Sequence, residues 1–131
     1  MLRELTAIIR SNKWKATAEA LRNAGFPALT RQRVYGRGRQ KGLRYPSASS
    51  GQVPGDTGFS GIPVLPKWML TLVVEDSQID KAMAALIAAN RSGEIGDGKV
   101  FVTKLGGALR LSDMKTGADA LDVKLPLPLE A

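Results

Sequence analysis

Most of the chain consists of two segments with the same order of expected elements, namely a strand, a helix and a second strand. Runs of alternating or continuous apolar residues indicate the strands, and apolar residues three and four positions apart indicate the helices. The expected elements are strand 5–10, helix 13–24, strand 29–35, strand 67–76, helix 78–92 and strand 99–105. This order predicts the α+β class and the ferredoxin-like arrangement βαββαβ, a four-stranded antiparallel sheet with both helices on one face.

Residues at the expected helix ends support this assignment. Ser11 or Asn12 is expected to cap the first helix, and Gly25 is expected to end it. Ser77 is expected to cap the second helix, and Gly93 is expected to lie at its end. In the first helix the apolar residues at helical spacing are Trp14, Ala18, Leu21 and Ala24. In the second helix the face expected to point inward holds Ile79, Met83, Leu86 and Ile87.

Two of the expected strands carry almost continuous apolar runs, Leu72–Val74 and Val100–Val102. Such runs are typical of strands that are covered on both faces. Two helices cover only one face of a sheet, so the other face needs a second partner. We therefore expect a homo-oligomer that closes sheet against sheet. The alternative is a monomer that is covered by its own C-terminal tail.

Residues 42–66 and the C-terminal tail show little periodicity. Residues 42–66 are rich in Gly, Ser and Pro and exceed the roughly 12–15 residues of an ordinary loop, so they form a functional loop or a disordered segment. In the tail, "ALRLS" (108–112) is compatible with a strand, and "LPLPLEA" (125–131) is expected to be extended or mobile.

Composition limits the function classes. The chain has 131 residues, which fits one domain, and it has no cysteine and no histidine. This composition excludes disulfides, thiolate metal sites and the commonest general base, so an enzyme is not expected. An enzyme that relies on carboxylates or lysine remains an alternative, although no paired-carboxylate motif stands out. No run of about 18 apolar residues predicts a membrane span. Arg3, Glu4 and Arg10 interrupt the apolar N-terminus, which argues against a signal peptide and for a cytoplasmic protein.

The positive charge is unevenly distributed. The formal net charge is +7, and no acid occurs between Glu19 and Asp56. Such a run attracts a polyanion or a phosphorylated ligand, or it forms a solvated surface. A nucleic-acid-binding module remains an alternative, although aromatic residues make up only 5% of the chain and no base-stacking pattern is present. The basic residues of this interval are Arg22, Arg31, Arg33, Arg37, Arg39, Lys41 and Arg44.

The segment "GEIGDGKVFV" (93–102) lies where the second helix ends and the last strand begins. Glycines allow backbone N–H groups to point at a ligand without hindrance from a Cβ atom. Lys99 would supply a positive charge for a phosphate group. Asp97 either accepts hydrogen bonds from ligand hydroxyls or ties the loop together. A purely structural turn explains the glycines equally well.

Three segments, taken in order, are much more specific. "GRGRQKG" (36–42), "LPKWML" (65–70) and "SGEIGDGKVFV" (92–102) resemble the PII family of nitrogen-regulatory signal proteins. The resemblance runs from about residue 2 to residue 112. It implies a homotrimer of ferredoxin-like domains that binds ATP or ADP in clefts between subunits. It also implies that the protein binds 2-oxoglutarate together with Mg-ATP, and that a long T-loop docks on target proteins.

The resemblance also implies a domain organisation. Residues 1–112 would form the PII-like domain, with the T-loop at about 38–66. Residues 113–131 would form a C-terminal extension that is partly mobile. The protein would be a sensor and not an enzyme. Its targets would be of the kind the family controls, such as an ammonium transporter, a nitrogen-assimilation enzyme or a nitrogenase component. Neither a nucleic acid nor a transmembrane segment is implied.

The family's ligand-binding positions carry over residue by residue. The resemblance implies that Gln40 binds Mg²⁺ beside the ATP phosphates, as a hard cation with few protein ligands requires. The implied 2-oxoglutarate site holds Gln40, Lys41, Gly42 and Lys67. The implied nucleotide site holds Thr30, Gly36, Gly38, Arg39, Gln40, Val73, Gly96, Asp97, Gly98, Lys99 and Arg110, with Arg110 reaching the phosphates across the subunit boundary.

The sequence departs from the family pattern in three places. The T-loop is longer than the common bacterial form, and it lacks a tyrosine at the usual uridylylation position, since Tyr45 lies too near the loop base. Where the family has a second phosphate-facing arginine, this chain has Ser112, or Lys115 if a short insertion is allowed. The T-loop and "GRGRQKG" look most like the nitrogenase-associated branch. A PII-like sensor of another metabolic process, with an altered effector, is the alternative function.

Overall fold

The computed structural model describes residues 1–37 and 64–122. Within them the chain forms one sheet with the strand order β2-β3-β1-β4. Every neighbouring pair of strands is antiparallel, so the expected antiparallel ferredoxin-like sheet is confirmed. The strands are β1 (Leu2–Arg10), β2 (Thr30–Gly36), β3 (Leu65–Glu75) and β4 (Lys99–Leu105).

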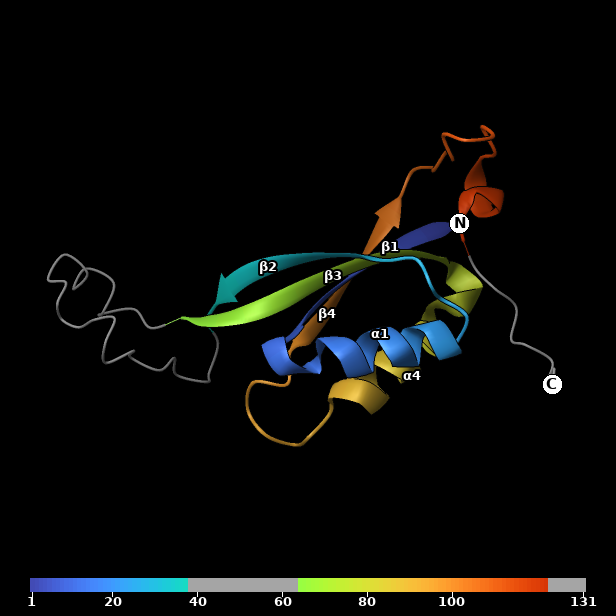
Figure 1. The fold of residues 1–131 in the computed structure, drawn as a ribbon. Helices are drawn as coiled ribbons and strands as arrows, with labels where there is room; N and C mark the ends of the chain where they lie inside the picture. The colour runs from blue at the N-terminus through green and yellow to red at the C-terminus, as the bar shows by residue number, and fades with distance from the viewer. Residues whose placement is uncertain (38–63, 123–131) are drawn as a thin grey trace, which may run out of the picture.

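The helices α1 (Trp14–Asn23) and α4 (Ile79–Asn90) lie side by side on one face of the sheet (Figure 1). Their inward side chains pack on the apolar residues of the two central strands. This burial is the main favourable contribution to folding. The core consists of Leu5, Ala7, Ile9, Leu21, Phe26, Leu70, Leu72, Val74, Ala82 and Leu86.

Gly25 ends the first helix as expected. Its φ of 101° is one that side-chain-bearing residues rarely adopt. The Gly25 N–H donates to the carbonyl oxygen of Arg22, and the Phe26 N–H donates to that of Leu21 at 2.8 Å. This pair of bonds is a Schellman motif, and Phe26 and Leu21 are both buried in the core. The glycine therefore turns the chain and places Phe26 in the core.

The expected helix caps are wrong. A short 3₁₀ turn precedes each helix, at Ser11–Lys13 and at Asp76–Gln78, and no side chain makes a capping hydrogen bond at either turn or helix start. The serines lie inside these turns, whereas the extended residues that precede the turns are Arg10 and Glu75. A serine inside a turn lacks the extended backbone that directs its oxygen at the first N–H groups.

The inward face of α4 also differs from the expected one. Ala82, Leu86 and Asn90 are buried, whereas Ile87 is 52% exposed. The buried Asn90 donates from Nδ2 to the Thr17 hydroxyl of α1 at 3.0 Å and to the carbonyl oxygen of Leu86. A hydrogen-bonded polar pair therefore holds the two helices together at a position where sequence periodicity predicts only apolar contacts.

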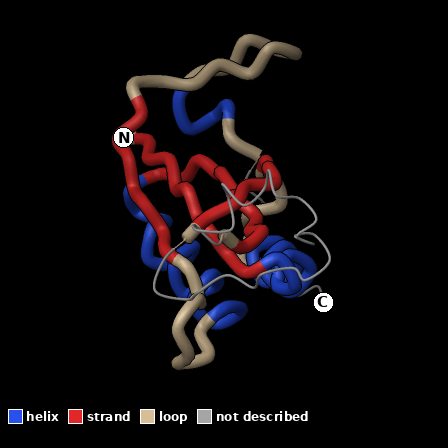
Figure 2. Tube along the Cα trace, turned by 90° about the vertical axis from the view of Figure 1, so that its left-hand side faces the viewer, coloured by secondary structure: helices blue, strands red, loops and turns tan. Residues whose placement is uncertain are grey.

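The face of the sheet opposite α1 and α4 carries no α-helix from the described residues, and only the short 3₁₀ turn Gly117–Ala120 lies near one end of it (Figures 1 and 2). Burial of both faces, expected from the apolar runs, is therefore not achieved within one chain. Phe101, opposite Thr6 on the uncovered face, is 53% exposed, and Val102, opposite the buried Leu5 on the helix-covered face, is 42% exposed. The physical reason is that β4 is an edge strand and both helices lie on the same side. We call the uncovered side the open face.

The C-terminal segment 106–122 lies beyond the end of β4, away from the helices (Figure 1). The strand considered for "ALRLS" is reduced to an isolated bridge between Leu109 and Thr116. A tight turn joins these residues, and a 3₁₀ turn, Gly117–Ala120, follows. The expected domain boundary at residue 112 stays a prediction. "LPLPLEA" lies outside the described residues.

Candidate functional site

A cavity of about 620 Å³ lies on the open face, where β2 ends and β3 begins. It brings together residues from three distant parts of the sequence, namely Gly36 of β2, Lys67 of β3 and the glycine-rich loop 96–99 before β4. A cavity of this size lies within the usual range for small-molecule sites. The remaining lining residues are Ile8, Arg37, Leu65, Glu94, Ile95 and Phe101.

The register of the sheet produces this juxtaposition. Arg10 at the end of β1 faces Lys67 of β3, and Ile8 of β1 faces Lys99 of β4. Val34 of β2 also faces Lys67. Residues directly opposite each other in a sheet point to the same face. The open face therefore holds cations of three different strands at one end of the sheet.

The loop before β4 is organised around Asp97. Its carboxylate accepts hydrogen bonds from the backbone N–H of Ser92 at 2.7 Å and of Gly93 at 3.0 Å, and also from the Ser92 hydroxyl. Arg10 Nη2 lies 3.4 Å from the same carboxylate. These donors, led by Ser92, lower the pKa of Asp97 to about 2. Of the two roles considered for Asp97, these contacts correspond to tying the loop together.

The glycines of this loop have separate structural reasons. Gly93 and Gly96 adopt φ values of 88° and 102°, which favour glycine over other residues. At Gly98 the φ is 115°, and a Cβ atom would lie 2.0 Å from the carbonyl oxygen of Ile8. The loop backbone therefore packs directly on β1. This close approach places Gly98 and Lys99 beside the cavity.

Lys67 and Arg10 hold the other side of the loop. Lys67 Nζ donates to the carbonyl oxygen of Gly96 at 3.2 Å, and Arg10 Nη2 donates to that of Ile95 at 2.8 Å. Burial lowers the pKa of Lys67, the positive charge of Arg10 lowers it further, and Asp97 partly opposes this effect. An anionic group in the cavity would be stabilised by this concentration of positive charge.

Sequence reasoning missed Arg10. It treated this residue only as a charge that interrupts an apolar N-terminus. Nothing in the local sequence distinguishes Arg10 from a solvated strand-end residue. Its contacts with Ile95 and Asp97 arise because β1 and β4 are neighbours in the sheet.

Two predicted nucleotide-binding residues lie elsewhere. Thr30 and Val73 line a second cavity of about 410 Å³ on the open face, near the other end of β3. Leu121 and Asp122 of the C-terminal segment line the same cavity. The structure therefore does not bring Thr30 and Val73 together with the glycine loop of the same chain.

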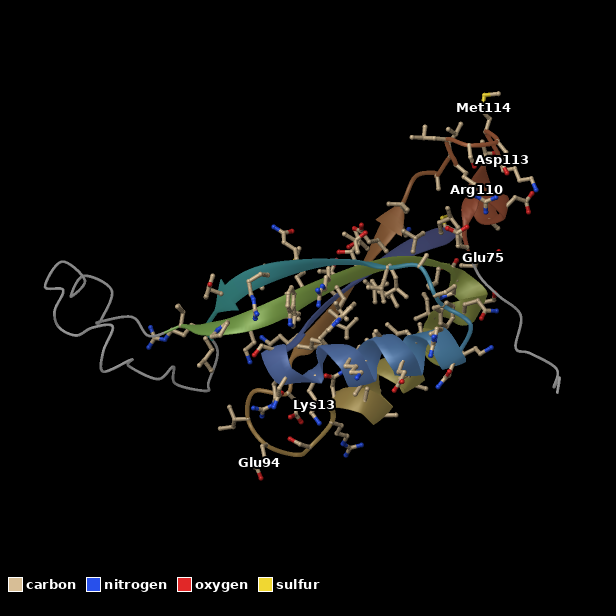
Figure 3. All side chains as sticks on the ribbon, in the orientation of Figure 1. Lys13, Glu75, Glu94, Arg110, Asp113 and Met114 are labelled. Atoms are coloured by element: carbon tan, nitrogen blue, oxygen red, sulfur yellow. The ribbon has the colours of Figure 1, made fainter. Side chains whose placement is uncertain are left out.

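Arg110 also lies far from the glycine loop. Figure 3 shows Arg110 and Asp113 at the end of the molecule opposite Glu94, which marks the loop. Arg110 Nη1 is 3.1 Å from Asp113 Oδ2, and Nη2 donates to Asp122 and to the carbonyl oxygen of Leu121, each at 3.2 Å. The guanidinium predicted to face a phosphate thus pairs with acids of its own chain.

The turn after Arg110 bears on the choice between Ser112 and Lys115. The backbone N–H of Arg110 donates to the carbonyl oxygen of Lys115 at 2.8 Å. The Lys115 N–H donates to Asp113 at 3.2 Å and is the main reason that the pKa of this carboxyl is lowered. Lys115 is therefore adjacent to Arg110 across the turn, and a role for it stays a prediction.

The remaining predicted site residues lie outside the described residues. They are Gly38, Arg39, Gln40, Lys41 and Gly42. The implied Mg²⁺ ligand Gln40 is among them, so the metal site stays a prediction. Within the described residues, 1–37 and 64–122, no group of three or more His, Cys, Asp or Glu side chains is placed to hold a metal ion.

The fold and this site together define an antiparallel α+β domain in which a glycine-rich loop and strand-end cations surround a small-molecule cavity. The family model described as nitrogen regulatory protein P-II matches residues 2–115 of the chain. The chain therefore belongs to the P-II family of nitrogen-regulatory proteins, as the sequence motifs predict.

Several relatives are similar over nearly the whole chain. A nitrogen fixation nifHD region glnB-like protein 2 of Methanococcus maripaludis is 35% identical, over 92% of this chain and 100% of that protein. A nifHD region GlnB-like protein 1 of Methanothermobacter marburgensis is 33% identical, over 88% and 99%. A nitrogen regulatory protein P-II of Cereibacter sphaeroides is 32% identical, over 92% and 100%. The nifHD relatives support the resemblance to the nitrogenase-associated branch.

A solved structure supports the fold. Arabidopsis thaliana PII bound to citrate superposes with a TM-score of 0.69 at 24% identity, and the match covers 91% of each chain. No helix in the described part of the chain is long and apolar enough to cross a membrane.

Proposed function

We propose that this protein is a PII-type signal-transduction protein that senses ATP or ADP together with 2-oxoglutarate. The observation that carries the proposal is the cavity that unites Gly36, Lys67 and the loop 96–99. Gly98 allows the loop backbone to approach β1, and Lys99 supplies a positive charge at the same edge. A phosphate group is the ligand that backbone N–H groups and a lysine bind most effectively together.

The site becomes complete only with a second copy of the chain. In space, Thr30, Val73 and Arg110 lie at the opposite end of the molecule from the loop that contains Lys99. Both cavities are on the open face, which exposes Phe101. We therefore propose a homotrimer in which the open faces meet. The glycine loop of one subunit would then face Thr30, Val73 and Arg110 of its neighbour across a nucleotide cleft.

The effector site is proposed around Lys67. Gln40 would hold Mg²⁺ together with the ATP phosphates, and Lys41, Gly42 and Lys67 would bind 2-oxoglutarate beside it. Lys67 lines the cavity close to Arg10, so a ligand carboxylate would relieve the repulsion between the two cations. The metal would supply a point of attachment for both ATP and 2-oxoglutarate.

The output is proposed to be regulation of a nitrogen-metabolism target by the T-loop, residues about 38–66, in the cytoplasm and without catalysis by this chain. The relatives from nifHD regions favour a target connected with nitrogen fixation. A PII-like sensor with an altered effector is the second candidate. It is favoured by the engagement of Arg110 with Asp113 and Asp122.

Calorimetry with ATP, ADP and 2-oxoglutarate tests the proposal. We expect both nucleotides to bind, and 2-oxoglutarate to bind only when Mg-ATP is present. Gln40→Ala should abolish 2-oxoglutarate binding while ADP binding is largely retained. If the nucleotides bind and 2-oxoglutarate does not, the altered-effector sensor is correct. If no nucleotide binds to the trimer, the proposed site is wrong.

A further inference from the structure

Two arginines of the basic run, Arg31 and Arg33, belong to a cluster on the helix-covered face that the ligand site leaves unexplained. Arg31 and Arg33 of β2 are opposite Leu70 and Trp68 of β3, and therefore point to the face that α1 and α4 cover. The cavity at Lys67 is on the other face. The cluster is thus separate from the proposed ligand site and from the open face.

Aromatic rings order both guanidinium groups. The Arg31 Cζ atom lies 4.3 Å from the ring centroid of Trp14 and 4.2 Å from that of Trp68. The Arg33 Cζ atom lies 4.2 Å from the centroid of the same Trp68 ring. The two tryptophan rings are 6.2 Å apart and tilted by 45°. We call these four residues the Arg–Trp cluster.

The cluster places two like charges close together without an acid of the described residues paired with either one. In the described part of the chain, neither Arg31 nor Arg33 forms an ion pair with an acid. Contact with an aromatic ring removes water from the guanidinium faces but leaves their N–H edges available. Two ordered guanidinium groups without a counter-ion repel each other, and an oxyanion between them removes this repulsion.

From this geometry we propose that the Arg–Trp cluster is a docking site for an acidic segment of a partner protein. Guanidinium forks match the geometry of carboxylates and bind them in a bidentate manner. Both arginines are exposed, and Tyr35, two residues further along β2, is 68% exposed. An exposed aromatic beside two ordered arginines is the composition of interaction hot spots.

An acidic peptide fits the cluster better than a nucleic acid does. The Trp14 and Trp68 rings carry guanidinium groups, so they are engaged by arginines and are not open platforms for bases. The two charges are concentrated at one ring, whereas a nucleic-acid backbone presents a continuous row of phosphates. Two neighbouring carboxylates on one short segment match this arrangement.

The test uses the whole protein and a fluorescein-labelled glutamate-rich peptide, with binding followed by fluorescence anisotropy. Arg31→Gln combined with Arg33→Gln should weaken peptide binding roughly tenfold or more, as expected for the loss of charge-assisted hydrogen bonds. Arg22→Gln combined with Arg91→Gln removes the same charge at two exposed positions outside the cluster. This control should change binding by less than about threefold, since it removes only long-range attraction.

Two further measurements separate the cluster from general charge. Replacing both arginines by lysine keeps the charge but removes the planar forks, and we expect most of the affinity to be lost. Thermal unfolding of each variant establishes that it is folded. Equal losses in the glutamine pair and the control pair would overturn the proposal. So would absence of peptide binding, or tighter binding of an oligo-dT strand at the same residues.

Discussion

The backbone of Gly98 packs directly against the carbonyl group of Ile8, so closely that a Cβ atom at Gly98 would lie 2.0 Å from that oxygen. This contact joins the loop before β4 to the C-terminal end of β1. It sets the position of Lys99, which is opposite Ile8 in the sheet. The glycine that marks the motif is thus required by packing, whatever ligand the loop binds.

Replacing Gly98 by alanine should destabilise the fold by about 2–4 kcal/mol, because the new methyl group meets backbone and the φ of 115° is strained. Urea unfolding measures the loss. Gly93→Ala is the control, since its φ is 88° but no atom lies within 4 Å. It should cost about 1 kcal/mol. Equal losses would contradict the packing argument.

Asp97 makes the loop sensitive to acid. Its pKa is lowered from 3.8 to about 2 in the folded protein, so the carboxylate contributes stability above the unfolded pKa. This contribution is lost as the pH falls from about 3.8 towards 2. Asp97→Asn should therefore lower stability at neutral pH and flatten the pH dependence in this window, as measured by urea unfolding. Asp119→Asn, at an exposed position, should leave the dependence intact.

Lys99→Ala should weaken the binding of ATP and of ADP alike by about 1.5–3 kcal/mol, because one charge-assisted bond to a phosphate is lost. Isothermal titration calorimetry measures both affinities. Lys104→Ala provides a matched comparison, since this exposed residue of the same strand is opposite Arg3 and does not line the cavity. Unchanged affinities in the Lys99 variant would show that the lysine does not face the nucleotide.

Lys67→Ala should remove 2-oxoglutarate binding and leave the trimer intact, as checked by calorimetry with Mg-ATP and by sedimentation. The pKa of Lys67 is lowered in the ligand-free chain, and a carboxylate beside it would raise that pKa again. Binding at alkaline pH should therefore take up protons. Calorimetry in two buffers of different ionisation enthalpy detects this uptake, and its absence in the wild-type protein would exclude Lys67 as the partner.

Asp113→Asn combined with Asp122→Asn should strengthen nucleotide binding about two- to fivefold, because both acids hold Arg110 through partly exposed ion pairs. Without these acids, the guanidinium can pair with a phosphate and no ion pair has to be broken first. The same double change should have no effect when Arg110 is already alanine. If the acids act only by their charge, the gain would persist in that background.

The order of elements could be predicted from the sequence, because periodicity and glycine conformation are local properties. The end of α1 before Gly25 follows from the left-handed φ of this glycine. The three segments 36–42, 65–70 and 92–102, taken in order, predicted the family. The expected helix caps were wrong, because a serine caps a helix only when its backbone is extended. That conformation depends on how the strand leads into the turn.

Other features were decided only by the tertiary structure. Arg10 joins the site because β1 is the neighbour of both β3 and β4, and nothing local to Arg10 signals this. The Arg–Trp cluster requires the register that sets Arg33 opposite Trp68. Arg110 is separated from the glycine loop because the loop precedes β4 and Arg110 comes after it, so that they lie at opposite ends of this strand (Figure 3). Contacts of this kind depend on which strands are neighbours and in which register, and both are set by burial of the whole core.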